Sequence, residues 1–128
     1  MFEKLEIVRM AQAMASHAGA RQGLIARNVA NADTPGYKAQ DLPDFGKAYQ
    51  AGDEGTMRAT RPGHLEGTAS SMAPQPRNSI GSSSPNGNSV SLEGEMVKAV
   101  EVRQQHDMAL AIYRNTGDIL RASLGRGR

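Results

Sequence analysis

The sequence predicts a mainly α-helical protein, in which two long terminal helices pair in a coiled-coil-like manner and a mostly irregular centre joins them. Apolar residues recur at spacings of three and four within residues 3–31 and again within residues 91–124. Between these stretches, positions 42–89 hold 7 Gly, 5 Pro and 7 Ser. We therefore expect three segments: a helical segment at 1–33, a turn and flexible centre at 34–90, and a helical segment at 91–128.

The N-terminal helix is expected over residues 3–31, with a length of about 43 Å at 1.5 Å per residue. Its apolar stripe has the spacing of a coiled-coil seam. Gly19 and Gly23 each weaken a helix interior by about 1 kcal/mol relative to Ala. They are either tolerated surface residues or sites of close contact with another backbone. The residues predicted to pack are Val8, Ala11, Ala15, Ala18, Ile25 and Val29.

The C-terminal helix is expected over residues 91–124, with Ser91 as its N-cap. Glu93 and Glu95 in the first turn suit the positive end of the helix dipole. The main apolar stripe is a heptad seam that Arg103 and His106 interrupt. The residues predicted to pack along it are Leu92, Met96, Ala99, Leu110, Tyr113, Leu120 and Leu124.

The central segment lacks the apolar residues that a core of its own would need. Its last part, NSIGSSSPNGNS, is of low complexity. Turn-forming residues leave room for a small β-hairpin within residues 45–75, although no strand there has a clear alternating pattern. We expect this segment to be mostly irregular.

Each terminal helix carries a second, thinner apolar face on roughly the opposite side from the first. A hairpin of two helices can bury one stripe on each helix, so the second faces are expected to form interfaces. Aromatic residues make up only 4% of the chain, which limits the core that one copy can build. The sequence therefore predicts an assembly subunit that is partly disordered as a monomer.

The first helix is followed by a turn with a specific chemistry, Thr34-Pro35-Gly36-Tyr37. Pro presets the first central position of a type II turn, and Gly accepts the positive φ of the second. Asn31 or Asp33 could take a left-handed conformation at the helix end. Asn28 and Asn31 lie on one side of the helix, where we expect their amides to hold the returning backbone or a neighbouring chain.

Several function classes find little support in the sequence. The chain has no cysteine, and its three histidines are scattered, so no catalytic residues, metal ligands or cofactor site are predicted. Catalysis is the first alternative, but the sequence shows no group of residues spaced for acid–base or metal chemistry. A nucleic-acid-binding coiled coil is the second, and its support is limited to Arg121 and the basic tail beyond it. Net charge is only +2, so nucleic acid is not expected as a partner. Without a catalytic group of residues, no small-molecule substrate is expected either.

The residues around the turn resemble the signature of the rod and hook group of bacterial flagellar axial proteins, and the short chain is similar to the proximal-rod members of that group. The resemblance covers the helix at each chain end and the short insert between them. Two short proximal-rod types remain open at this point, as does a generic helical assembly protein. The signature residues are Asn28, Ala30, Asn31, Thr34, Pro35, Gly36, Tyr37 and Lys38.

The resemblance implies a structural, non-enzymatic role in the basal body, where subunits would self-assemble into the drive shaft and the wall of the export channel. The partners it implies are the subunit itself, other rod subunits, the rod-base adaptor FliE, the inner-membrane ring and the flagellar export gate. The location it implies is the rod that spans the periplasm. The opening MFEKLEIVRMAQAMA has no uninterrupted apolar region, so export without a cleavable signal peptide is expected.

Overall fold

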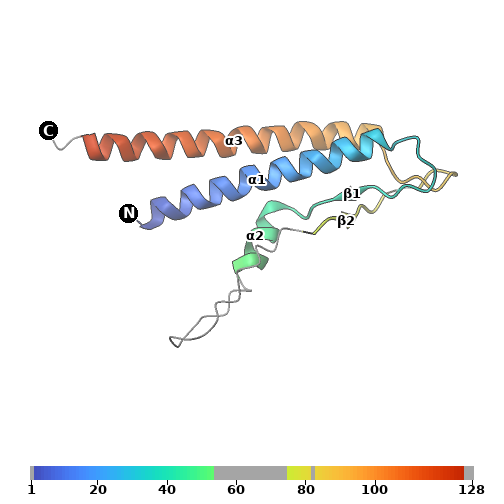
Figure 1. The fold of residues 1–128 in the computed structure, drawn as a ribbon, viewed down its shortest axis with the longest axis horizontal. Helices are drawn as coiled ribbons and strands as arrows, with labels where there is room; N and C mark the ends of the chain where they lie inside the picture. Colours follow the sequence, from blue (N-terminus) through green and yellow to red (C-terminus); the bar gives the residue numbers. More distant parts are fainter. Residues whose placement is uncertain (1, 54–74, 82, 126–128) are drawn as a thin grey trace, which may run out of the picture.

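The computed structural model describes residues 2–53, 75–81 and 83–125. Its elements follow one another as α1 (Phe2–Ala30), β1 (Gln40–Asp41), α2 (Phe45–Asp53), β2 (Arg77–Asn78) and α3 (Leu92–Gly125). Figure 1 shows α1 and α3 lying antiparallel along the long axis of the molecule, with the short elements below α1. The predicted mainly helical fold with two long terminal helices is confirmed.

The bounds of the long helices agree with those expected from the sequence to within one residue at each end. At the start of α3, Ser91 is the N-cap: its Oγ accepts a hydrogen bond from the backbone N–H of Gly94 at 3.3 Å, and its carbonyl accepts one from Glu95 at 2.9 Å. At the end of α1, the backbone continues into turns over residues 31–36. Local chemistry therefore determines where α1 ends and where α3 begins.

The core between the two long helices is small. Ala18 and Ile25 of α1 pack against Val102 of α3, and Ala99 lies partly buried beside them. Ala11, Ala18 and Ile25 are buried at intervals of seven, as expected for one side of a coiled-coil seam. Of the other predicted packing positions on α1, Val8 and Ala15 are half-buried, and Val29 is exposed.

On α3, the seam that faces α1 is displaced from the predicted one. The buried positions are Glu95, Val102, Ala109 and Thr116, again seven apart. Two of these four residues are polar, so the spacing of apolar residues alone did not reveal this seam. Of the residues that the sequence assigned to packing, Ala99, Leu110 and Leu120 are half-buried beside this seam, whereas Leu92, Met96, Tyr113 and Leu124 are exposed.

The central segment returns along α1 instead of standing apart from it. We call residues 37–43 the strap; it contains β1, which pairs antiparallel with β2 through Gln40 opposite Asn78 and Asp41 opposite Arg77. This short pairing flanks the region in which a hairpin was expected, and residues 54–74 of that region lie outside the described residues. The nine-residue helix α2 was not predicted, because the sequence around it is rich in Gly and polar residues.

The helical pair has two unlike ends. The closed end comprises residues 21–41 and 84–98, where the turn, the strap and the start of α3 meet. The open end comprises residues 5–15 and 109–124, toward the chain termini, where α1 and α3 diverge (Figure 1). Asn28, Asn31 and the turn that the sequence singled out lie at the closed end.

Candidate functional site

The turn after α1 has the predicted type II geometry. The backbone N–H of Tyr37 donates to the carbonyl of Thr34 at 3.3 Å, and Gly36 has a φ of +74°. A side chain at Gly36 would meet no atom within 4 Å, so the requirement for glycine is one of backbone conformation. The prediction that Asn31 or Asp33 takes a left-handed conformation is wrong, since every non-glycine residue in the described part of the chain has a negative φ.

Asn28 connects three segments from within α1. Its side chain is fully buried. The amide Nδ2 donates to the carbonyl of Gln40 at 2.8 Å and to Oε2 of Glu95 at 3.1 Å. Its Oδ1 accepts from the backbone N–H of Gln40 at 3.1 Å and from the Tyr37 hydroxyl at 3.2 Å. One carboxamide thus uses both of its donors and both of its acceptor sites to join the helix, the turn, the strap and α3.

A chain of charges runs beside this amide. Arg21 binds Asp41 of the strap through two hydrogen bonds, Nε to Oδ1 at 2.8 Å and Nη2 to Oδ2 at 3.0 Å. Lys98 of α3 lies 3.4 Å from Asp41 Oδ2 and donates to Oε1 of the buried Glu95 at 3.1 Å. The network therefore alternates in sign from α1 through the strap to α3, and it ends on Asn28.

The charges within the network stabilise one another. Burial raises the pKa of Asp41, but the hydrogen bond and charge of Arg21, together with the charge of Lys98, outweigh this effect and leave the pKa below its ordinary value. The hydrogen bond to Asp41 raises the pKa of Arg21. The carboxylate and the guanidinium therefore remain ionised at neutral pH and hold the strap against α1.

Asn88 is a second buried amide, and its role was not predicted from the sequence. Its Nδ2 lies within hydrogen-bond distance of three carbonyls at the end of α1: Asn31 at 2.9 Å, Ala32 at 2.7 Å and Thr34 at 2.9 Å. Its Oδ1 accepts from the backbone N–H of Val90 at 2.8 Å. Asn88 thus holds the turn that follows α1 from a position more than fifty residues farther along the chain. The Asn-Gly-Asn triplet in low-complexity sequence was the available signal, and it indicated only a turn.

Two glycine turns pack back to back at the tip of the closed end. Gly87 has a φ of +82°, and a Cβ added to it would lie 3.4 Å from the Cα of Gly36. The N–H of Gly36 donates to the carbonyl of Asn86 at 3.1 Å. Both turns use glycine because each has a positive φ, and at Gly87 the neighbouring backbone also lies close.

Of the remaining signature residues, Asn31 and Thr34 have local contacts. Asn31 donates through Nδ2 to the carbonyl of Arg27 at 2.8 Å, and Thr34 donates to Oδ1 of Asn31 at 3.2 Å. Lys38 reaches across to the carbonyl of Gly87 at 3.1 Å. Ala30 and Pro35 are exposed. Asn28 therefore carries long-range contacts, whereas Asn31 stabilises the end of its own helix.

Closer to the N-terminus of α1, His17 also holds the strap. Its Nε2 lies 2.8 Å from the carbonyl of Pro43, and its ring meets that of Phe45 edge-on at 5.6 Å between centroids. Tyr49 of α2 stacks on Phe45 in turn, with centroids 5.4 Å apart. Successive contacts at positions 28, 21 and 17 thus fasten the strap antiparallel to α1.

The open end is held together differently. A groove of about 170 Å³ lies between α1 and α3, because alanines at the seam positions leave the space unfilled. Apolar side chains stand exposed nearby, including Leu5, Met10 and Ile119. The residues that line the groove are Ala11, Gln12, Ala15, Ala109, Leu110 and Tyr113.

The chemistry of the closed end suits the fastening of backbone segments. Within residues 2–53, 75–81 and 83–125, no three acidic or histidine side chains gather as metal ligands would. In the same residues, no helix combines the length and apolarity that crossing a bilayer requires. The amides and charges at this end are instead directed at main-chain groups and at one another.

Comparison with known proteins points to one family. A family model described as "Flagella basal body rod protein" matches residues 11–38, which run from the α1 seam through the turn. The flagellar basal body rod protein FlgB of Agrobacterium fabrum is 31% identical over 118 residues, which are 88% of each chain. FlgB of Cereibacter sphaeroides is 36% identical over 102 residues, 76% of this chain and 78% of the relative. Both relatives are of FlgB type, and neither is of FlgC type, which is the other short proximal-rod type.

Proposed function

We propose how this chain, which belongs to the flagellar basal body rod protein family, builds its part of the flagellum. It is a structural subunit of the proximal rod, of FlgB type, and it assembles with other rod components in the basal body. The family is structural and not a family of enzymes. In our proposal, the closed end keeps each subunit in one shape, and the outward helix faces join it to its neighbours.

The observation that carries this proposal is the placement of the family signature. The residues matched by the family model, 11–38, include Asn28 and the turn, which together fasten the strap and α3 to α1. A signature devoted to internal fastening suits a subunit that must transmit torque without changing shape. Hydrogen bonds in a water-poor site give such directional rigidity.

The partners and the route to the rod are further parts of the proposal. We propose that the subunit contacts the adaptor FliE, the inner-membrane ring and the export gate, and that it reaches the periplasm through the flagellar export channel. The terminal segments 1–33 and 91–128 would form the rod wall and line the channel, and the segment 34–90 would brace neighbouring subunits.

Several residues that were predicted to pack are exposed in the single chain, and in this assembly they would form contacts between subunits. Val29, Leu92, Met96, Tyr113 and Leu124 would contact neighbouring subunits, because they do not pack within the chain. Leu110 and Leu120, half-buried beside the seam, would serve both contacts. Leu110→Asp or Leu120→Asp should abolish incorporation into rods, and rods of normal composition in those variants would remove these residues from the interface.

The direct test is a strain deleted for this gene. We expect the deleted strain to make no rod or hook, and mass spectrometry should find the wild-type chain in washed hook–basal bodies of the complemented strain. Normal swimming of the deleted strain, with the chain absent from the particle, would overturn the rod assignment.

The closed end can be tested in the same strain with a matched pair of substitutions. Asn88→Ala removes the amide that meets the end of α1, whereas Asn115→Ala removes an exposed amide from α3. We expect motility to be lost only with Asn88→Ala. Equal motility of the two variants would show that the fastening is dispensable for the rod.

A further inference from the structure

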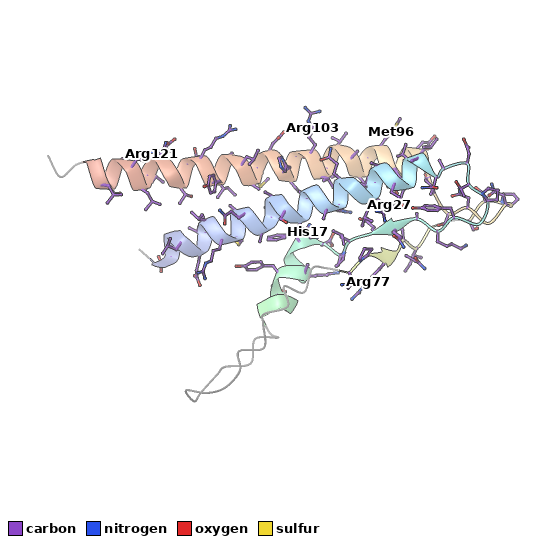
Figure 2. All side chains as sticks on the ribbon, viewed as in Figure 1. His17, Arg27, Arg77, Met96, Arg103 and Arg121 are labelled. Carbon is purple, nitrogen blue, oxygen red and sulfur yellow. The ribbon has the colours of Figure 1, made fainter. Side chains whose placement is uncertain are left out.

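The outward face of the first half of α3 is apolar and exposed. Met96 is 69% exposed, Val97 60% and Val100 69%, and Leu92 lies at the edge of the same face. Figure 2 shows Met96 on the side of α3 that faces away from α1. Three large apolar side chains this exposed within five residues form a surface that a partner is needed to cover.

The outward face of α1 has the opposite shape. Gly19 and Gly23 lie on it, and a Cβ at either position would meet no atom within 4 Å. Ser16, Ala20 and Ala26 are exposed around them. Glycines four residues apart leave a shallow groove into which side chains of another helix can fit.

The two faces lie at the same level along the molecule. The hydrogen bond between Asn28 and Glu95 and the packing of Ile25 on Val102 set the register of the helices. In this register, positions 96–100 of α3 stand beside positions 23–27 of α1. Both faces lie outside the seam between α1 and α3, so a second copy placed beside the first without an axial shift can bring the exposed side chains of α3 onto the glycine groove.

The charges at the borders of the two faces are complementary. Glu93 and Glu101 flank Val97 at intervals of four on α3, and both are exposed. Arg27 follows Gly19 and Gly23 at the same interval on α1, and it is also exposed. A carboxylate on one copy and the guanidinium on the next would therefore meet at the edge of the contact, which favours this orientation over one that brings two α3 faces together.

We propose that Met96, Val97 and Val100 of one copy dock into the Gly19–Gly23 groove of the next copy of this chain. This inference rests on the proposed rod function and names one lateral contact within it. The contact joins unlike faces, so it repeats from copy to copy around a ring or along a helix. It also gives the two helix-weakening glycines a purpose, since larger residues there would keep the neighbour out.

The test uses cysteines, of which the natural chain has none. A tagged copy with Gly23→Cys and an untagged copy with Val97→Cys are expressed together in the deleted strain, and purified basal bodies are oxidised mildly. Since a disulfide requires Cα atoms roughly 4–7 Å apart, a tagged–untagged dimer is expected only if the faces meet. Gly46→Cys replaces Gly23→Cys in the control pair, because Gly46 lies in α2 with open space around it and should give no dimer.

Other products would overturn the proposal. Dimers of Val97→Cys with itself would mean that like faces meet, and incorporated cysteine variants without a mixed dimer would mean that these faces are apart. Neither result would affect the rod function, which fails only if the wild-type chain is absent from basal bodies.

A second measurement does not depend on oxidation. Gly23→Leu should reduce incorporation at least tenfold in competition with wild type, because the side chain would occupy the groove. Gly46→Leu should be incorporated as well as wild type. Equal incorporation of both leucine variants would overturn the docking.

Discussion

The closed end and the open end of the helical pair are built from the same two helices but held by different chemistry. At the closed end, two buried amides, a four-residue charge network and two glycine turns determine the geometry. At the open end, alanines line the space between the helices, and larger apolar side chains face outward. Polar contacts need correct distances and directions, so they specify one arrangement. Contacts between small apolar side chains permit several arrangements.

The difference suggests a division of labour within each subunit. The closed end can keep its shape in every copy, whereas the open end can adapt to whatever lies beside it in the rod. Substitutions should therefore change the stability of the subunit's own fold strongly at the closed end and weakly at the open end. Four experiments test this contrast, ordered by expected effect.

The largest effect is expected for Asn28→Ala. The substitution leaves the backbone N–H and carbonyl of Gln40 and the Oε2 atom of the buried Glu95 without a partner, which should lower the free energy of unfolding by about 4 kcal/mol at about 1–3 kcal/mol per unpaired group. Urea denaturation followed by circular dichroism measures it. The exposed Asn115→Ala at the open end should change stability by less than about 0.5 kcal/mol. Equal losses of stability in the two variants would contradict the proposed difference between the closed and open ends.

The next effect is expected for the ion pair between α1 and the strap. Arg21→Ala should cost about 2 kcal/mol at neutral pH, because it leaves Asp41 charged and partly buried. The folded-state pKa of Asp41 lies below its unfolded value, so the stabilisation is present above about pH 4 and is lost as the pH falls further.

Stability measured from pH 7 down to pH 2 should therefore fall more steeply in wild type than in Arg21→Ala. Arg121→Ala, which removes an exposed pair with Asp118 at the open end, should leave the profile unchanged. Parallel profiles for wild type and Arg21→Ala would mean that the network contributes nothing to stability.

A smaller effect is expected for Gly36→Val. A β-branched residue at positive φ costs about 1–2 kcal/mol, and no neighbouring atom adds a clash. We expect this variant to be exported but to fail in assembly, which swimming assays and the content of basal bodies can separate. Gly36→Asn should assemble, because Asn tolerates the left-handed region. Normal motility of Gly36→Val would contradict the role of the turn.

The smallest effect, of opposite sign, is expected for Ala15→Leu at the open end. The larger side chain can enter the groove and should raise stability by about 1 kcal/mol, measured by thermal unfolding. Ala122→Leu, exposed near the end of α3, provides the control and should change little. If Ala15→Leu destabilised the chain, the open end would be packed as tightly as the closed end.

The sequence was most informative where the signal was local. The spacing of apolar residues placed both long helices to within one residue, and Ser91 and Gly36 carry caps and turns that depend on their own backbone. On α1, Ala11, Ala18 and Ile25 were expected to pack, and they are buried. The expectation of a partly disordered monomer stays a prediction, which hydrogen exchange of the two ends would measure.

The features that the sequence did not predict depend on contacts between residues far apart in the chain. On α3, the line that faces α1 contains Glu95 and Thr116, and a search for apolar residues therefore selected an adjacent line with Met96 and Leu92. Asn88 looked like an ordinary turn residue, because the three carbonyls that its Nδ2 meets are more than fifty positions away in the chain. Its local contacts are those of a turn, and no local pattern marks the long-range ones.

The distance along the chain between Asn88 and the carbonyls it meets has a consequence for the order of folding. The end of α1 is completed by a residue 54–57 positions further along, and Asn28 finds Glu95 only after 67 positions. Closing such long loops is slow and entropically costly. The first third of the chain can form the turn and the contacts between α1 and the strap, but Asn88 and Glu95, which complete the closed end, come much later. A chain delivered one end first would therefore stay incomplete until nearly all of it had emerged, which delays the formation of a rigid subunit until the subunit is free of whatever conduit delivers it.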